Sequence, residues 1–206
     1  GRGRRGRAWA SPLAAHVYLS VSRRFDGGIA ALQGLSLAVG VAAAEALHSL
    51  GYRDVGLKWP NDLLVGDRKL GGILVEIGGD AAGELRVVVG LGINVAMPAD
   101  AARGIDQPWC DLAGLSPQPP SRQAVATALL DALLPLLARF EREGLAPFLA
   151  RWPRHDQLAG RAVRLEEGGR VHEGIAAGVA PDGALRLRLA EGERCFHAGE
   201  ASLRAA

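Results

Sequence analysis

Four arginines and three glycines open the chain in the pattern GRGRRGR, residues 1–7. Arginine presents a planar fork of donors that matches phosphate and carboxylate groups, and glycine lets backbone N–H groups approach a ligand closely. A loop of this composition can close over a bound anion and exclude water from it. A solvated arginine-rich tail is the simpler interpretation, and composition alone leaves both open.

Gly1, Gly3 and Gly6 also match G-x-G-x-x-G, the fingerprint of a dinucleotide-binding turn. That site requires a strand before the glycines and a helix after them. No preceding strand is visible, because the sequence begins at these glycines, and Trp9, Ser11 and a strand follow them. The Walker pattern G-x-x-x-x-G-K-[ST] is absent as well. The sequence context therefore disfavours both kinds of nucleotide-binding loop.

Three later segments combine charged or amide side chains with glycine or proline: KWPND at 58–62, DRKLGGILVE at 67–76 and GLGINV at 90–95. Each has an ordinary structural explanation. Lys69 can be a solvated lysine of a turn, Asn61 and Asp62 are common turn residues, and Asn94 can end a strand. Residue type alone does not decide between these explanations and a binding site.

The elements that must position these residues follow an α+β pattern. Residues 16–21 are typical of a strand, and apolar residues at helical spacing predict a helix over 30–50 that Gly51 ends. Glycine, aspartate and asparagine turns join the next β-like runs, which predict an antiparallel sheet: 55–58, 69–77 and 85–95. The proline-containing stretch 96–120 is expected to be a loop.

Ser121 can cap a second long helix that reaches Glu143, with Pro135 expected to kink or break it. Residues 145–152 can add a short helix. From Arg161 onward, short β runs alternate with turns, and about five strands in so short a segment are typical of a small SH3-like barrel. These patterns predict a main domain over 1–153 and a barrel domain over 154–206.

Charge and cysteine content narrow the classes of function. The net charge is +2, and the arginines of residues 1–7 supply four positive charges, so the rest of the chain carries a net −2. This favours a local anionic ligand over a basic DNA-binding face. Two cysteines make a weak disulfide framework, and with no signal peptide or apolar run of membrane-spanning length we expect a cytoplasmic protein. The histidines and cysteines lack zinc-ligand spacing.

In order and spacing, GRGRRGRAWASP, KWPND, DRKLGGILVE and GLGINV resemble the biotin protein ligases, the biotin–[acetyl-CoA carboxylase] ligases of bacteria. The resemblance extends to EGLAPFLARW at 143–152 and to the β-rich end. Lipoyl-protein ligases share the fold group but are not expected to combine this arginine loop with KWPND. The resemblance implies a mixed, mostly antiparallel sheet packed with helices, of the class II synthetase-like type, followed by an SH3-like barrel.

The resemblance also implies a two-step reaction that uses ATP, biotin and Mg²⁺. The biotin carboxylate attacks the α-phosphate of ATP to give biotinyl-5′-AMP and pyrophosphate, and a lysine of a biotin carboxyl carrier protein then displaces AMP. Preorganised cations would stabilise the charge that builds up on the phosphorus, and a closing loop would keep water from the mixed anhydride.

By the same resemblance, Arg4, Lys69 and Asp62 are the catalytic residues. Arg2 and Arg4 contact biotin and phosphate, Lys69 reaches the reacting carboxylate, and Asp62 lies near Mg²⁺ or serves as base for the incoming amine. Asn94 could meet an adenine edge, while Trp109 could stack on adenine or merely anchor its loop. The implied binding residues are Gly1, Arg2, Gly3, Arg4, Lys58, Asn61, Lys69, Gly71, Asn94 and Trp109, with no metal ligand among them.

Part of the family's biotin pocket, a Ser/Thr-Thr-Asn segment and a glutamine, precedes the arginine loop and is not among these residues. We therefore expect an N-terminally truncated ligase whose activity alone is weak. The expected partner is the carrier protein of acetyl-CoA carboxylase, with homodimerisation and an upstream DNA-binding domain left open. Two other functions remain: binding of biotin or carrier without catalysis and, less favoured, nucleic-acid binding by the arginine loop, which would depend steeply on salt.

Overall fold

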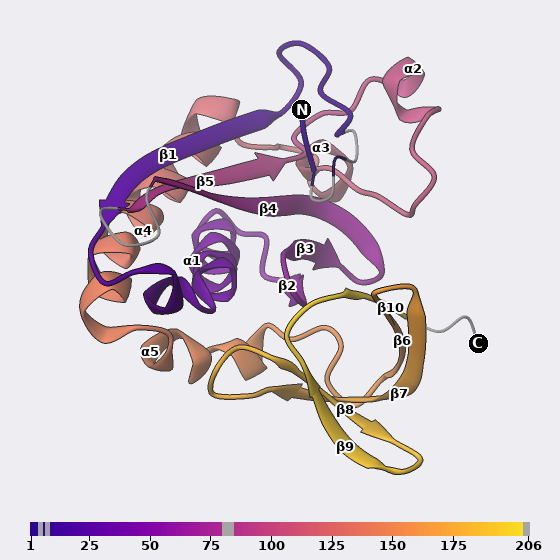
Figure 1. Ribbon diagram of the computed structural model, residues 1–206. Coiled ribbons are helices and arrows are strands. Elements are labelled where there is room, and N and C mark those ends of the chain that lie inside the picture. Colours follow the sequence, from indigo (N-terminus) through magenta and orange to yellow (C-terminus); the bar gives the residue numbers. More distant parts are fainter. Residues whose placement is uncertain (4–5, 7–8, 80–84, 204–206) are drawn as a thin grey trace.

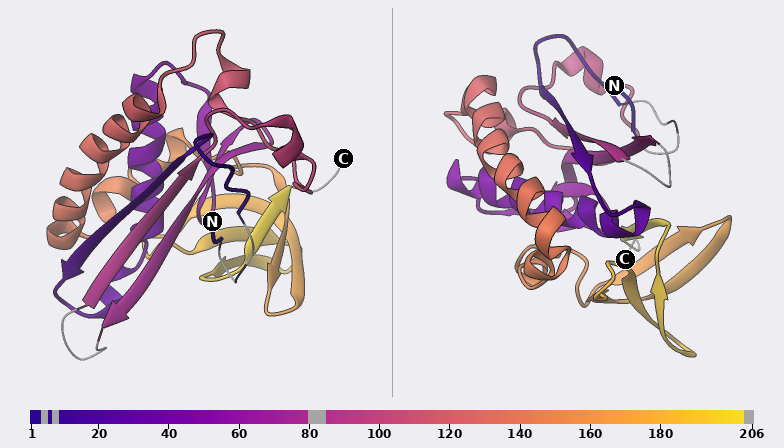
Figure 2. Two further views of the ribbon diagram at one scale, coloured as in Figure 1. Left: turned by 90° about the horizontal axis from the view of Figure 1, so that it is seen from above. Right: turned by 60° about the vertical axis from the view of Figure 1, so that its left-hand side comes forward.

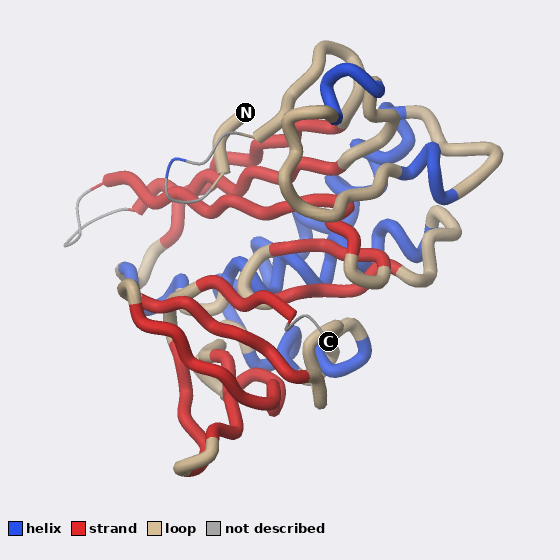
Figure 3. Tube along the Cα trace, turned by 90° about the vertical axis from the view of Figure 1, so that its right-hand side faces the viewer, coloured by secondary structure: helices blue, strands red, loops and turns tan. Residues whose placement is uncertain are grey.

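Two five-stranded antiparallel sheets form the framework of the protein (Figure 1). The computed structural model describes residues 1–3, 6, 9–79 and 85–203. Figure 3 shows the strands of the two sheets as separate groups. This is the predicted α+β arrangement of a larger helix-covered sheet followed by a small all-β unit.

The central sheet has the strand order β1-β5-β4-β3-β2. Its strands are β1 (Val17–Phe25), β2 (Val55–Lys58), β3 (Asp62–Val65), β4 (Arg68–Gly79) and β5 (Leu85–Ile93). Along β5, buried residues alternate with more exposed ones, as expected for a strand with one face on the core. Helices cover that face (Figure 2), which leaves the other face available for a ligand.

The strand β3 was not predicted. Its sequence, DLLV, lies between the turns at 61–62 and 66–67, and only the turns were assigned. In the structure the turn comprises residues 59–61, and Asp62 already pairs with Gly72 of β4. The other strands of this sheet agree with expectation within a few residues, except that β1 continues to Phe25.

The helix predicted over 30–50 is two elements. A 3₁₀ turn, η2 (Ile29–Leu32), is followed by α1 (Leu35–Ser49). Gly34 interrupts them because its φ of 78° is left-handed and a Cβ there would come within 2.4 Å of the Leu145 side chain. Gly51, with φ of 96°, lies directly after the Leu50 cap of α1, as predicted for the glycine that stops this helix.

The second long helix, α4 (Arg122–Glu143), begins at Ser121, whose side chain accepts a hydrogen bond from the Ala124 N–H. The helix continues through Pro135, so the predicted alternative of a break is wrong. Proline removes one backbone donor, and Pro135 lies on the exposed side of the helix, where water can reach the freed carbonyl.

The predicted loop 96–120 holds two four-residue helices, α2 (Ala99–Ala102) and α3 (Leu112–Leu115). Two more short helical elements, α5 (Ala146–Leu149) and η3 (Trp152–Arg154), lead toward the second sheet. By length and composition alone, residues 29–49 and 122–143 could each span a membrane. In this fold the two helices pack against each other and against the central sheet.

The second sheet has the order β10-β6-β7-β8-β9. Its strands are β6 (Ala162–Glu167), β7 (Arg170–Val179), β8 (Leu185–Leu189), β9 (Gly192–Phe196) and β10 (Glu200–Leu203). The short final strand β10 was not assigned from the sequence. It brings residues 199–201 to the region between the two sheets, where they line a cavity with residues of the central sheet.

Candidate functional site

A cavity of about 440 Å³ lies between the open face of the central sheet, the N-terminal segment and the second sheet. Gly1, Arg2 and Gly3 line it, so the first part of the glycine–arginine motif reaches the cavity. The remaining predicted loop residue, Arg4, lies outside the described residues. The other predicted residues that line the cavity are Lys58, Asn61, Asp62 and Lys69.

The backbones of Gly1 and Trp9 close the base of the arginine loop. The Trp9 N–H donates to the Gly1 carbonyl at 3.1 Å, and the Gly1 amino group donates to the Trp9 carbonyl at 3.2 Å. The Ser11 hydroxyl also donates to the Trp9 carbonyl. Trp9 is thereby held where the motif ends, and its ring enters the cavity.

Glycines of two neighbouring strands make room for this ring. A Cβ on Gly72 would lie 3.3 Å from the Trp9 ring, and a Cβ on Gly92 would lie 3.2 Å from it. Gly71 serves the strands themselves, since a Cβ there would be 2.6 Å from the Gly92 carbonyl oxygen. The glycines of the two motifs therefore let Trp9 and the strands approach closely.

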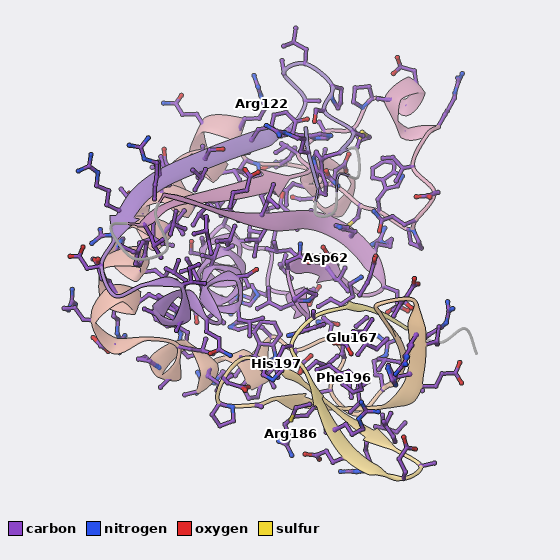
Figure 4. All side chains as sticks on the ribbon, viewed as in Figure 1. Asp62, Arg122, Glu167, Arg186, Phe196 and His197 are labelled. Carbon is purple, nitrogen blue, oxygen red and sulfur yellow. The ribbon has the colours of Figure 1, made fainter. Side chains whose placement is uncertain are left out.

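Asp62 joins the two lysines of the site. Its carboxylate lies 2.8 Å from Lys69 Nζ and 3.0 Å from Lys58 Nζ. The antiparallel register explains the meeting: Lys58 of β2 is paired with Asp62 of β3, and Lys69 lies on the adjacent strand β4. Figure 4 shows Asp62 between the central sheet and the second sheet.

The Asp62 side chain is only 10% exposed, so the charge of its carboxylate depends on these partners. Burial alone would raise its pKa. The positive charges of Lys69 and, to a smaller extent, Lys58 outweigh burial and hold the pKa of Asp62 below its usual range. The cluster Lys58–Asp62–Lys69 therefore carries one net positive charge beside the cavity.

Lys69 is held from three directions. Its ammonium group lies 5.3 Å from the centre of the Trp9 ring, in range of a cation–π contact. Its N–H donates to the Pro108 carbonyl, and its carbonyl accepts from Cys110 N–H, each at 2.9 Å. The loop segment around Trp109 thus fixes the Lys69 backbone while the side chain extends to the cavity.

The two predicted asparagines differ in position. Asn61 lines the cavity, and its Nδ2 donates to the Ile73 carbonyl at 2.8 Å. Asn94 is buried, and its Nδ2 donates to the Cys110 carbonyl at 3.0 Å. Three predicted residues lie close behind Lys69 and outside the set of cavity-lining residues: Gly71, Asn94 and Trp109.

Several cavity residues were missed in the sequence. Tyr18, Glu76 and Glu200 line the cavity, and so does Trp9, which was not among the predicted binding residues. Alternation along β1 and β4 could have placed Tyr18 and Glu76 on the open face. Nothing local could have found Glu200, because it reaches the cavity only through the packing of the second sheet.

Among the described residues, no group of three or more histidine, cysteine, aspartate or glutamate side chains could hold a metal ion. Asp62 already binds two ammonium groups, so it is a poor ligand while they remain. Mg²⁺ usually keeps several waters and is held by substrate phosphates with one or two carboxylates. Glu76 and Glu200 are the other carboxylates among the described residues that line the cavity.

Comparisons with known proteins identify the family of the chain. The biotin/lipoate A/B protein ligase family matches residues 1–94, and the biotin protein ligase C-terminal domain matches residues 159–204. The bifunctional ligase/repressor BirA of Escherichia coli (strain K12) is 43% identical over 208 residues, which cover 100% of this chain and 64% of that protein.

The biotin--[acetyl-CoA-carboxylase] ligase of Paracoccus denitrificans is 34% identical over 207 residues, which cover 97% of this chain and 85% of that protein. The structure of biotin protein ligase from Aquifex aeolicus in complex with biotin and ATP superposes with a TM-score of 0.83 at 27% identity, covering 100% of this chain and 85% of that one. The chain belongs to the biotin protein ligase family.

Proposed function

We propose that the protein activates biotin with ATP as biotinyl-5′-AMP and transfers the biotinyl group to a lysine of a carrier protein. The observation that carries this proposal is the cluster Lys58–Asp62–Lys69 at a cavity that Arg2 also lines. The names and bound ligands of the relatives support biotin and ATP as substrates.

The first step must bring two anions together, the biotin carboxylate and the triphosphate. Lys58, Lys69 and Arg2 place positive charge around one cavity, which lowers the repulsion between the anions and stabilises charge that develops at phosphorus. An ammonium group has three donors, and in the proposed step Lys69 gives up the donor that contacts Asp62 to bind a substrate oxygen. Both residues line the cavity, so this exchange needs no refolding.

The second step needs a proton acceptor for the incoming lysine amine. In the ligand-free state Asp62 is a weak base, because its pKa is held low by two ammonium groups. Transfer of Lys69 to the substrate removes the stronger of the two charge interactions of Asp62 and raises its basicity. Asp62 therefore pairs with the Lys69 ammonium group in the ligand-free state. It becomes a better proton acceptor after the substrate has bound than it was before.

The proposal includes Mg²⁺, which would bind together with ATP and partly neutralise the charge of its phosphates. The carrier protein of acetyl-CoA carboxylase is the proposed partner, which the name of the Paracoccus relative supports. The cytoplasmic location, the homodimer and the domain boundary after residue 153 stay predictions. The chain spans 64% of the length of the first curated relatives. The activity of the whole protein is therefore part of the proposal as well.

The proposal is tested by biotin-dependent exchange of pyrophosphate into ATP, followed by transfer of labelled biotin to an apo carrier domain. We expect exchange only with biotin present and transfer to one carrier lysine. Biotin binding without exchange would instead support a protein that binds the ligand without catalysis. Tight DNA binding that falls steeply with salt, without any exchange, would support the nucleic-acid alternative.

A further inference from the structure

The turn that carries the KWPND motif is attached to the second sheet. Trp59 is almost fully buried, and its indole N–H donates to the carbonyl of Gly183 at 3.0 Å. Gly183 lies in the turn between β7 and β8, more than a hundred residues further along the chain. Trp59 directly follows Lys58 and precedes Asp62 by three residues, so this hydrogen bond holds the tip of the hairpin that carries both charges.

The acceptor turn is itself rigidly built. Gly183 has a φ of 87°, and its N–H donates to the Ala180 carbonyl at 2.8 Å. The Asp182 carboxylate accepts from the N–H of Ala184 at 3.0 Å. A Cβ on Gly183 would lie 3.3 Å from the Leu37 and Leu145 side chains. The carbonyl that binds Trp59 is therefore fixed by the turn and by the helices behind it.

A second attachment runs along the edge strand β2. The Leu57 N–H donates to the His155 carbonyl at 2.6 Å, and the Gln157 N–H donates to the Leu57 carbonyl at 2.9 Å. A Cβ on Gly56 would lie 2.2 Å from the Gln157 side chain, so a larger residue there would displace that side chain. The segment that leads into the second sheet thus pairs with the strand that ends at Lys58.

From these contacts we infer that Trp59 is a positioning residue, through which the second sheet sets the geometry of the cluster Lys58–Asp62–Lys69. The inference rests on the proposed function for its consequence in catalysis. Lys58 and Asp62 are the two ends of the turn that Trp59 anchors, and they are paired across the hairpin. A shift of the turn therefore changes the distances from Asp62 to both lysines. It thereby changes how easily Lys69 gives up its contact with Asp62.

The test compares Trp59→Phe, which keeps an aromatic ring and removes the N–H donor, with Gly183→Ala, which strains the acceptor turn. The control is Arg161→Gln. It breaks another contact between the two parts, the exposed pair of Arg161 with Asp67 at 2.8 Å, away from the motif turn. All variants are first checked for cooperative unfolding, and Trp59→Phe decides the question if Gly183→Ala does not fold.

We expect Trp59→Phe to lower kcat for biotin-dependent pyrophosphate exchange by about 5- to 10-fold and to change KM for ATP by less than about twofold. This is the effect expected when one buried hydrogen bond that orients the site is lost. Arg161→Gln should stay within about twofold of the parent in both constants. A Trp59→Phe variant that matches Arg161→Gln in kcat overturns the inference.

A second readout does not depend on activity. Titration of the Asp62 carboxyl by ¹³C NMR should give a higher midpoint in Trp59→Phe than in the parent, because the two ammonium groups are held less closely. The midpoint in Arg161→Gln should equal that of the parent, and an unchanged midpoint in Trp59→Phe counts against the inference. If the parent itself lacks exchange activity, the proposed function fails, while the titration still decides whether Trp59 positions the cluster.

Discussion

Replacement of Asp62 by asparagine is the most direct test of how one carboxylate stabilises the two lysines of the site. The variant keeps the size of the side chain and removes the negative charge between Lys58 and Lys69. Asparagine at this position also imitates a protonated Asp62. The comparison of parent and variant therefore isolates the charge on one side chain that is 10% exposed and bound at 2.8 and 3.0 Å to two ammonium groups.

The magnitude follows from burial. Removal of one partner from a fully buried ion pair costs about 3–5 kcal/mol, because the remaining charge is left without compensation. The side chains of Lys58 and Lys69 are each 17% exposed, so water can compensate part of that loss. We expect Asp62→Asn to lower the free energy of unfolding by about 2–4 kcal/mol at pH 7.

The dependence on pH has a definite sign. The folded-state pKa of Asp62 is lowered from the ordinary value of 3.8, so the unfolded state binds the proton more readily. The stabilisation by Asp62 is then fully present above pH 3.8 and is lost as the pH falls through the folded-state pKa. Below that range, parent and Asp62→Asn should converge in stability.

Urea unfolding of both proteins between pH 2.5 and pH 7, at about 0.5-unit steps, measures this difference directly. Asp67→Asn serves as control, since the Asp67 carboxyl forms an exposed pair with Arg161 and should contribute about 0–1 kcal/mol. A difference between parent and Asp62→Asn that is as small as in the control, or that persists below the acid range, would refute the reasoning.

Three further substitutions test other parts of the site. Lys69→Gln should reduce biotin-dependent pyrophosphate exchange by about 10²- to 10³-fold, the usual loss when one preorganised donor to a developing charge is removed, measured by exchange kinetics. Gly92→Ala places a methyl group 3.2 Å from the Trp9 ring and should raise KM for biotin or ATP more than it lowers stability, measured by kinetics beside thermal unfolding. Asn94→Ala should cost about 1–3 kcal/mol of unfolding free energy, because the Cys110 carbonyl loses its buried donor.

The sequence predicts most of this fold where the signal is local. Long periodic segments such as α4, and β5 with its alternating burial, were found within a few residues. The break before α1 was missed because Gly34 is needed for the contact with Leu145, 111 positions away along the chain. The strand β3 lies between two turn signals that mask it, and its identity depends on pairing with its two neighbours.

The same limit applies to the site. The motifs predict that Lys58, Asp62 and Lys69 matter, but only the register of three strands brings their charges into contact. The approach of Gly183 to Trp59 and the position of Glu200 depend on how the second sheet packs. Local sequence can therefore identify chemical groups, whereas their partners come from contacts between distant segments.

The cluster Lys58–Asp62–Lys69 accounts for how the protein can keep several cations at one cavity while it remains stable. Two lysines and Arg2 without a counter-charge would repel one another and would leave half-buried ammonium groups unpaired. Asp62 lowers that cost in the ligand-free state, but it also competes with any anion that binds. The resulting affinity for each substrate is weaker than three free cations would give. In the proposed reaction, Lys69 would regain its contact with Asp62 when the product leaves, so the same carboxylate that limits binding would also return the site to its starting state.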